Sequence, residues 1–317
     1  KRVAIIGAGI SGLASAYFLS RKHQVFLYEK ETRIGGHTHT VSVESKNGAA
    51  QVDTGFIVHN EPNYPIFSRL MRELSVATQP SDMSFAVTSP DGSFEYSSRG
   101  LRGFFARRAN IFRPSQYKLF REICRFNREA PKLLENPDQQ DWTLAHFLEA
   151  GHYDLGFIER YLYPMTAALW SMPPGELGGF PARTLIGFMQ HHRMLTVSGQ
   201  YQWRTIRGGS NTYLEPITAP FRDRIVTGAN ITAVTRSESG VTIDFPDRPS
   251  AQFDDVVFAC HGNQILPLLR NPTVLERDVL GNFTTTRNEV CLHSDRRLDR
   301  RSTRLNSSHV ALSRMPS

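Results

Sequence analysis

Cysteine is scarce in this sequence, and the few cysteines do not form a recognisable motif. Only Cys124, Cys260 and Cys291 occur among 317 residues, and none of them belongs to a C-x-x-C pair. The chain therefore offers neither a cysteine zinc motif nor a disulfide framework, and we expect no metal site. An odd number of cysteines is typical of a reducing compartment, so we expect a cytoplasmic location.

Several other signatures are missing. No run of about 18 apolar residues could span a bilayer, and the chain opens with strand-like sequence rather than a secretory leader. Peripheral membrane contact stays open. There is no G-x-S-x-G elbow and no Gly-Lys-Ser/Thr loop. The usual signatures of an α/β-hydrolase and of a P-loop NTPase are therefore absent.

Acidic residues are in slight deficit, and the excess positive charge is concentrated at one end. The net charge is +7, from 37 basic and 30 acidic residues. Residues 296–317 hold six arginines and one aspartate, which leaves only +2 on the rest. We therefore expect no nucleic-acid partner. The segment 99–128 is rich in arginine and phenylalanine; such a basic helical face is usually solvated, and the alternative is a patch for acidic lipid or an anionic substrate.

The first 29 residues predict a βαβ unit. Val3–Ile6 is a short apolar run typical of a buried parallel strand, residues 11–22 have helical periodicity, and Val25–Glu29 resembles a second strand. With 317 residues and 40% hydrophobic composition, the chain is long enough for about two domains. Hairpins are predicted over 40–53, across Asn47-Gly48, and over 84–97.

A glycine-rich turn joins the first strand to the first helix. Gly7, Gly9 and Gly12 form G-x-G-x-x-G in the context that gives the pattern a mechanism. Gly7 permits the tight turn, Gly9 lets the backbone approach a pyrophosphate, and Gly12 lets the helix pack on the strand. Glu29 ends the second strand, where a carboxylate accepts hydrogen bonds from ribose hydroxyls and repels a 2′-phosphate.

A second glycine pair follows Glu29 and favours a flavin over a nicotinamide cofactor. Arg33 precedes Gly35, Gly36 and His37, and paired glycines let backbone amides come close to an anion. At this point the sequence resembles the FAD-dependent oxidoreductases that include amine oxidases, protoporphyrinogen oxidase and carotenoid desaturases. In that family the R-x-G-G segment approaches the flavin diphosphate. The resemblance implies FAD as the cofactor.

Later segments extend the resemblance in the right order. Asp53-Thr54-Gly55 resembles the family's D-x-G strand, Arg207-Gly208-Gly209 its later glycine pair, and Asp255–Ala259 its D-x-V-V-x-A strand. The resemblance implies that Ile231 offers its backbone to the adenine. The cofactor-binding residues we expect are Gly7, Gly9, Gly12, Glu29, Arg33, Gly35, Gly36, His37, Gly209 and Ile231.

More narrowly, the sequence resembles a bacterial subgroup of predicted NAD/FAD-binding, amine-oxidase-like proteins. His37-Thr38-His39-Thr40 and Leu169–Pro173 carry this resemblance. Genes of the subgroup often neighbour methyltransferases of the cyclopropane fatty acid synthase type, which suggests an acyl or lipid substrate. His37 stands where the wider family frequently has arginine, so neither the arginine contact nor amine oxidase activity carries over directly.

Hydride transfer to a flavin asks little of side chains, because the protein mainly holds the donor carbon over the ring. Catalytic candidates are the polar residues near the expected flavin: His37, His39, His59, Asn60 and Tyr64. For the substrate, Trp170 and His191 are candidates, although both could equally belong to the packing of a helical domain. Of the pair His191-His192, we expect one side chain on the helix surface and one against the core. Oxygen, a quinone or another redox protein would each serve as electron acceptor.

The predicted fold is α/β, with a Rossmann-like FAD-binding domain and an inserted, mainly helical substrate domain. The FAD-binding domain takes residues 1–61 and 200–270, and the insertion takes 62–199. Residues 271–298, with a strand expected over 289–293, begin a second substrate-domain segment. The resemblance stops near Asp299, and residues 299–317 resemble translated adapter sequence, so we expect a C-terminally truncated chain with a non-native tail.

Three functions are compatible with these patterns. The first is a flavin-dependent oxidase, dehydrogenase or desaturase that takes a hydride from a small or lipid-like substrate. The second is an NAD-dependent dehydrogenase, which shares the first glycine motif but leaves Arg33-x-Gly35-Gly36 without a role. The third is a non-catalytic or inactive nucleotide-binding fragment.

Overall fold

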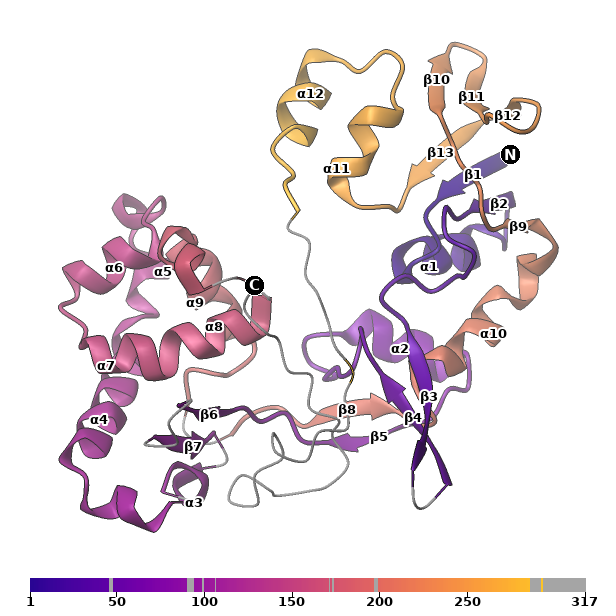
Figure 1. Ribbon diagram of the computed structural model, residues 1–317. Helices are drawn as coiled ribbons and strands as arrows, with labels where there is room; N and C mark the ends of the chain where they lie inside the picture. Colours follow the sequence, from indigo (N-terminus) through magenta and orange to yellow (C-terminus); the bar gives the residue numbers. More distant parts are fainter. Residues whose placement is uncertain are drawn as a thin grey trace. The chain divides into compact units, whose positions relative to one another are not determined.

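The computed structural model describes residues 1–45, 48–89, 94–98, 100–105, 107–170, 172, 174–196, 199–285 and 292. The chain divides into two compact units, which are described separately (Figure 1). Unit 1 comprises residues 1–58, 66–79 and 204–287. Unit 2 comprises residues 59–65, 80–203 and 288–317.

Unit 1 is built on a parallel sheet in the order β13-β1-β2-β9. Its strands are β1 (Arg2–Ile6), β2 (Gln24–Tyr28), β9 (Ile225–Val226) and β13 (Asp255–Phe258). Val3 pairs with Val25 on one side and with Asp255 on the other, so the first strand is central. Helix α1 (Ile10–Leu19) connects β1 to β2. The predicted α/β class and the opening βαβ unit are confirmed.

The two faces of this sheet carry different layers because side chains alternate along each strand. Val3, Ile5 and Leu27 lie on one face and pack with Leu13 and Ala16 of α1. On the other face, Ala4, Ile6 and Tyr28 pack with Val234, Ile243 and Phe253. The latter three belong to an antiparallel sheet of β10 (Ala233–Ser237), β11 (Gly240–Asp244) and β12 (Ala251–Phe253). The parallel strands are thus covered on both faces.

Other elements of unit 1 surround this core. The hairpin of β3 (Thr40–Ser45) and β4 (Gly48–Asp53) is antiparallel, as predicted. The helices are α2 (Pro65–Glu73), η5 (Ser210–Tyr213), α10 (Leu214–Thr218), η6 (Ala219–Arg224), α11 (Gly262–Ile265), η7 (Leu266–Leu268) and α12 (Val274–Leu280). Strands β5 (Thr78–Ser81) and β8 (Trp203–Ile206) pair where the chain passes from one unit to the other.

Unit 2 is mainly helical. Its helices are α3 (Gly100–Phe104), η1 (Arg108–Phe112), α4 (Pro114–Glu129), α5 (Lys132–Glu135), η2 (Pro137–Gln139), α6 (Leu144–Ala150), α7 (Leu155–Phe157), η3 (Ile158–Leu162), α8 (Tyr163–Trp170), η4 (Pro174–Gly179) and α9 (Ala182–His191). One antiparallel hairpin accompanies them, β6 (Ala86–Thr88) with β7 (Glu95–Ser97), where a hairpin was predicted.

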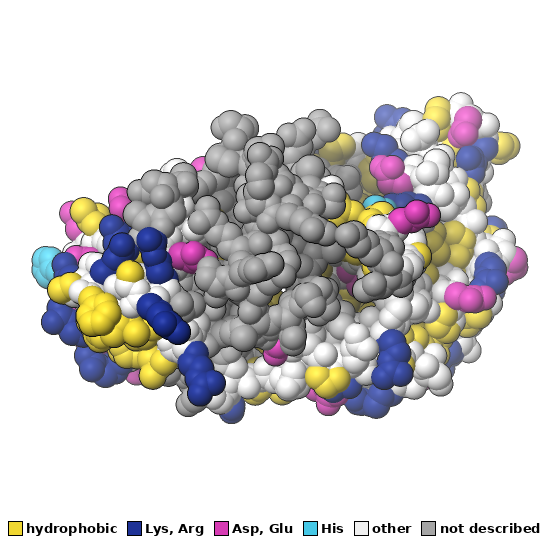
Figure 2. Space-filling view, turned by 60° about the horizontal axis from the view of Figure 1, so that its bottom comes forward, with side chains coloured by type: hydrophobic (Ala, Val, Ile, Leu, Met, Phe, Trp, Pro, Cys, Tyr) yellow, Lys and Arg dark blue, Asp and Glu magenta, His cyan; other side chains and the backbone are white. Residues whose placement is uncertain are grey.

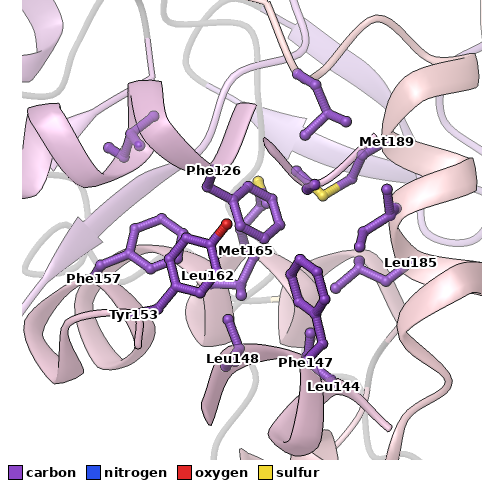
Figure 3. Packing of buried hydrophobic residues seen from close by; sticks show 14 of the residues in the cluster. Phe126, Leu144, Phe147, Leu148, Tyr153, Phe157, Leu162, Met165, Leu185 and Met189 are labelled. Atoms are coloured by element: carbon purple, nitrogen blue, oxygen red, sulfur yellow. The ribbon is translucent and has the colours of Figure 1, made fainter. Parts of the chain in front are cut away.

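The core of unit 2 is aromatic at its centre. Phe126 of α4 is fully buried, and its ring lies 5.3 Å from that of Phe157 and 5.7 Å from that of Tyr153 (Figure 3). Leu144, Leu162 and Met165 complete the packing around these rings. Burial raises the pKa of the Tyr153 hydroxyl to about 12, so this tyrosine is neutral at physiological pH.

Some boundaries differ from those predicted. The strand expected from Ile231 begins at Ala233, because the N–H of Ile231 donates to the carbonyl of Ala229 in a tight turn instead of entering the ladder. Residues 66–79, which we had assigned to the insertion, belong to unit 1. The reason is the amphipathic helix α2, whose Leu70 and Met71 are buried in the core of the parallel sheet. The expected strand 289–293, apart from residue 292, and the tail 299–317 lie outside the described residues.

Cys124 and Cys260 are free thiols. Among the described residues, no helix combines the length and apolar character that crossing a membrane requires. The same part of the chain contains no group of three histidine, cysteine or acidic side chains placed to hold a metal ion.

Candidate functional site: a glycine cradle beside Glu29

The predicted glycine turn follows β1 directly. Gly7 has φ of +104°, and its N–H donates to the carbonyl of Tyr28 on the neighbouring strand over 2.8 Å. A Cβ on Gly12 would stand 1.8 Å from the carbonyl oxygen of Gly7. Only a glycine at position 12 therefore lets α1 start this close to the strand.

The second glycine pair lies against this turn. The N–H of Gly35 donates to the carbonyl of Ala8 over 2.8 Å, and Gly9 forms an isolated parallel bridge with Gly35. Gly36 has φ of +57°, and a Cβ there would stand 3.0 Å from the Cα of Gly9. A Cβ on Gly9 itself would meet nothing within 4 Å. The turn at 7–12 and the pair Gly35-Gly36 are separated in sequence by α1 and β2, but they lie against each other. Together they form a cradle of backbone without side chains, called the glycine cradle, which is open at Gly9.

The side chain of Arg33 holds the second segment of this cradle in place. Its guanidinium donates to the carbonyl oxygens of Gly36, over 2.9 Å, and of Thr38, over 3.3 Å. His37 follows as an exposed residue whose carbonyl accepts from the N–H of Phe56 over 2.8 Å. The His37 ring lies 5.7 Å from that of His261, which sequence reasoning had not singled out.

Glu29 stands where the carboxyl end of β2 meets the glycine turn. Its carboxylate accepts from the backbone N–H of Ala8 over 2.7 Å and from that of Glu31 over 2.9 Å. A carboxylate has about four lone-pair sites, so two remain for further donors such as ribose hydroxyls. Cys260 follows β13 nearby; burial, reinforced by the charge of Glu29, raises the pKa of its thiol above the usual value.

Gly209 and Ile231 occupy different surroundings. Gly209 has φ of +98°, and a Cβ there would stand 2.4 Å from Cγ2 of Thr40. Asp53 connects the two segments: its carboxylate accepts from the Ser210 N–H over 2.9 Å and from the Thr40 hydroxyl over 2.6 Å. Ile231 lies two residues beyond Ala229, whose N–H donates to the carbonyl of Glu29 over 2.8 Å. The structure thus brings the Ile231 segment, at 228–231, to the Glu29 side of the cradle.

Unit 2 gathers several of the remaining candidates into one aromatic group. His192 is buried, and its ring lies 4.2 Å from Phe188, 6.0 Å from Tyr64 and 5.7 Å from Trp203, on which it stacks. Trp170 joins the group because its ring lies 4.8 Å from that of Phe188. Burial, with the neighbouring His191, lowers the pKa of His192, so its ring is neutral at pH 7.

His191 lies at the edge of this group, with its ring 5.7 Å from that of His192. Its side chain is exposed, and its backbone carbonyl accepts from Nδ2 of Asn63 over 2.9 Å. One histidine of the pair therefore lies on the surface and the other against the core, and the buried one is His192. The helical period alone predicts that adjacent residues point in different directions. Whether His191 or His192 faces inward depends on tertiary packing.

His59 and Asn60 are both buried in the short segment 59–65 of unit 2. The Asn60 side chain accepts from the N–H of Asn63 over 2.9 Å, and its carbonyl accepts from the N–H of Tyr64 over 3.1 Å. Asn60 thereby shapes the turn that precedes α2. Burial raises the pKa of the Tyr64 hydroxyl.

The cradle fits the diphosphate of a dinucleotide. Bare backbone at Gly9 and Gly36, a helix that starts at Ile10 and a carboxylate at Glu29 supply the close approach, the positive helix end and the ribose acceptor that such a cofactor needs.

A known protein family matches most of the chain. Residues 10–303 match the family described as flavin containing amine oxidoreductases. The chain belongs to this family. Its membership confirms the predicted resemblance and FAD as the family's cofactor, and it does not favour the NAD-dependent alternative.

Several solved structures have a related fold that matches most of this chain. A putrescine oxidase bound to putrescine is 19% identical with a TM-score of 0.68; the match covers 89% of this chain and 63% of that one. A cyclohexylamine oxidase from Brevibacterium oxydans IH-35A is 21% identical with a TM-score of 0.65, over 88% of this chain and 62% of that one. A fatty acid isomerase from P. acnes that produces CLA is 18% identical with a TM-score of 0.55, over 88% and 63%.

At these identities the likeness concerns the fold. The chain spans about three fifths of the length of these structures. A search of curated proteins gives no match.

Proposed function

We propose that unit 1 binds FAD at the glycine cradle and that the protein oxidises a small or lipid-like molecule by hydride transfer to the flavin. The observation that carries the proposal is the juxtaposition of two glycine segments with Glu29. A Gly36 Cβ would stand 3.0 Å from the Cα of Gly9, and the Glu29 carboxylate accepts from the N–H of Ala8, the residue before Gly9. An NAD-dependent enzyme has no need for the second segment.

Each residue of the cradle has a distinct task in this proposal. Gly7 and Gly12 set the turn, and Gly9 leaves the N-terminus of α1 open to the diphosphate. Gly35 and Gly36 bring a second stretch of backbone to the same anion, and Arg33 holds that stretch in shape through the Gly36 carbonyl. Glu29 uses its remaining lone pairs for the ribose hydroxyls, and the segment that ends at Ile231 lies beside the adenine.

Bound FAD supplies an acceptor for two electrons and a proton, delivered as a hydride from a substrate carbon. The chain then has to orient that carbon and to exclude water. As residues of unit 2 that contact the substrate we propose Trp170, Phe188 and Trp203, together with His192 and the neighbouring His191. His37, His59 and Tyr64 stay catalytic candidates. Gly209 supports the site through Thr40 and Asp53.

The role of Glu29 is tested by titrating the purified chain with FAD and following flavin fluorescence. Glu29→Arg removes the ribose acceptor and places a cation beside Ala8, so we expect FAD affinity to fall by at least about a hundredfold, the loss of two hydrogen bonds to a charged group. Glu31→Arg is the matched control, because it makes the same charge change at an exposed side chain two residues away.

In this titration the control should retain FAD affinity within about threefold. Equal affinity in both variants would contradict the assignment of Glu29. Tighter binding of NAD⁺ than of FAD by the unsubstituted chain would instead support the dehydrogenase alternative.

A further inference from the structure

Unit 2 carries a strongly basic stretch that the flavin chemistry does not use. Between residues 100 and 121 the sequence contains no aspartate or glutamate. It contains six cationic residues, Arg102, Arg107, Arg108, Arg113, Lys118 and Arg121. Arg102 lies on α3, Arg108 on η1, and Lys118 and Arg121 on the first half of α4, while Arg107 and Arg113 flank η1. These six residues, together with Leu101, Ile111, Phe112 and Tyr117, are called the basic patch.

Large apolar side chains stand exposed within the same stretch. Phe112 is 85% exposed, Leu101 56%, Tyr117 51% and Ile111 47%. A single exposed apolar residue is ordinary, but a group of four that includes a nearly fully exposed phenylalanine marks an interaction surface. In Figure 2 dark blue and yellow side chains lie next to one another at the lower left of the view.

Buried polar side chains hold this exposed turn in place. Asn110 is fully buried and donates to the carbonyl of Glu95 over 2.8 Å, and buried Gln116 donates to the carbonyl of Phe104 over 3.0 Å. The Tyr117 hydroxyl donates to the carbonyl of Ile111 over 2.9 Å. The outward position of Phe112 therefore belongs to a structured turn, and its exposure adds little ordering cost on binding.

A depression of about 480 Å³ lies beside the exposed turn. Its lining residues Pro114, Tyr117, Lys118 and Arg121 follow the i, i+3, i+4, i+7 spacing of one helical face, with Ser115 beside them. Lys118 also forms an ion pair with Asp154. The hollow thus combines an aromatic wall with cationic side chains, a combination that suits a phosphate headgroup whose acyl chains lie beside Phe112.

We propose that the basic patch docks unit 2 onto the surface of a membrane that contains anionic phospholipid. Cations are attracted to such a surface, while exposed aromatic and aliphatic side chains enter the boundary between headgroups and acyl chains. A nucleic acid would offer phosphates to the arginines, but it would give Leu101 and Ile111 no apolar environment. The combination of cationic and exposed apolar side chains therefore favours a lipid surface over a nucleic acid. The proposal does not depend on flavin binding.

Co-sedimentation of the full chain with vesicles tests this surface. One set of vesicles contains phosphatidylcholine alone, and the other contains equimolar phosphatidylcholine and phosphatidylglycerol. We expect binding to the anionic vesicles, weakened by added salt, and little binding to the neutral ones. The arginines of the C-terminal tail are identical in all variants, so differences between variants report on the patch.

Two variants separate the apolar from the electrostatic contribution. Phe112→Ala should weaken binding to anionic vesicles roughly tenfold, because it removes one large side chain from the interface. The double variant Arg108→Glu with Arg121→Glu should weaken it by at least about a hundredfold. Controls in unit 1 are Leu275→Ala, at an exposed leucine, and the charge-matched pair Arg270→Glu with Arg277→Glu.

The controls should bind within about threefold of the unsubstituted chain, and all variants should keep the same far-ultraviolet circular dichroism. Absence of preference for anionic vesicles would overturn the proposal. So would a patch variant that binds like its control. Tight binding to a DNA duplex that Phe112→Ala leaves unchanged would overturn it in favour of a polyanion surface.

Discussion

Gly36 stands so close to Gly9 that a Cβ on the former would lie 3.0 Å from the Cα of the latter. This contact joins two segments separated by β2 and places bare backbone on both sides of one small space. Side chains elsewhere in the chain maintain the contact: Arg33 fixes the Gly36 carbonyl, and Glu29 fixes the N–H of Ala8. The proposed binding site is thus a backbone structure that side chains hold in shape.

Gly9→Ala should mainly weaken FAD binding, whereas Gly12→Ala should mainly lower the stability of the fold. Gly9 has φ of −73° and open space where its Cβ would be, so alanine there should change the free energy of unfolding by no more than about 1 kcal/mol while it weakens FAD binding. Gly12→Ala drives a Cβ against the Gly7 carbonyl and should cost at least about 2 kcal/mol without any ligand. Urea unfolding of the flavin-free variants measures both; equal stability of the two would contradict the described packing.

Cys260 provides a pH-dependent report on the cradle. Burial and the Glu29 carboxylate raise the pKa of its thiol above the ordinary value of about 9, so the reactive thiolate forms only at higher pH. Alkylation of Cys260 by iodoacetamide, followed by mass spectrometry of its peptide, should therefore have its midpoint at higher pH than alkylation of an exposed cysteine in a model peptide. Glu29→Gln removes the negative charge and should move that midpoint to lower pH. A midpoint that Glu29→Gln leaves in place would show that the two groups do not interact.

Asp53 should stabilise unit 1 although it belongs to no predicted catalytic group. Its carboxylate accepts from the Ser210 N–H and hydroxyl and from the Thr40 hydroxyl. Asparagine has only one acceptor oxygen, and its NH2 group would face donors. We expect Asp53→Asn to cost about 1–3 kcal/mol in urea unfolding. Asp244→Asn is the control, because the carboxylate of half-buried Asp244 accepts from the Ser250 hydroxyl at an exposed position, and its loss should cost less. A larger loss in the control would contradict this account of Asp53.

The aromatic core of unit 2 should be sensitive to truncation at its centre. Phe126 is fully buried among Phe147, Tyr153 and Phe157, so Phe126→Ala should cost about 3–5 kcal/mol. Phe112→Ala removes the same side chain from an 85% exposed position and should leave the stability within about 0.5 kcal/mol. Thermal unfolding of both variants provides the comparison; a similar loss in each would mean that Phe112 is packed rather than exposed.

The sequence predicted the local part of the fold and the central part of the site. Gly7, Gly9, Gly12 and Glu29 were recognisable because strand, turn and helix are contiguous there, and the turn residues at Gly48 marked one hairpin. Contacts between distant segments were not predictable, since no local period encodes them. They include the pairing of Leu27 with Ile225 and the bonds from Ser210 to Asp53.

The roles of some named residues also depended on tertiary structure. Arg33 is expected at the cofactor, and its guanidinium donates to the Gly36 and Thr38 carbonyls of its own loop, which the sequence does not indicate. Trp170 and Tyr64 were identified as candidates, but the residue that connects their aromatic group is His192, whose inward orientation the sequence could not distinguish from that of His191. Cys260 and His261 approach the cradle only because β13 lies beside β1.

The most direct test of the flavin proposal is the visible absorption of the purified chain after incubation with excess FAD and removal of free flavin by gel filtration. The account predicts a yellow protein that carries close to one FAD per chain, released on denaturation and identified as FAD. Gly9→Ala, equally folded, should emerge with little flavin. A folded, unsubstituted chain that emerges colourless would contradict the claim that this cradle binds FAD.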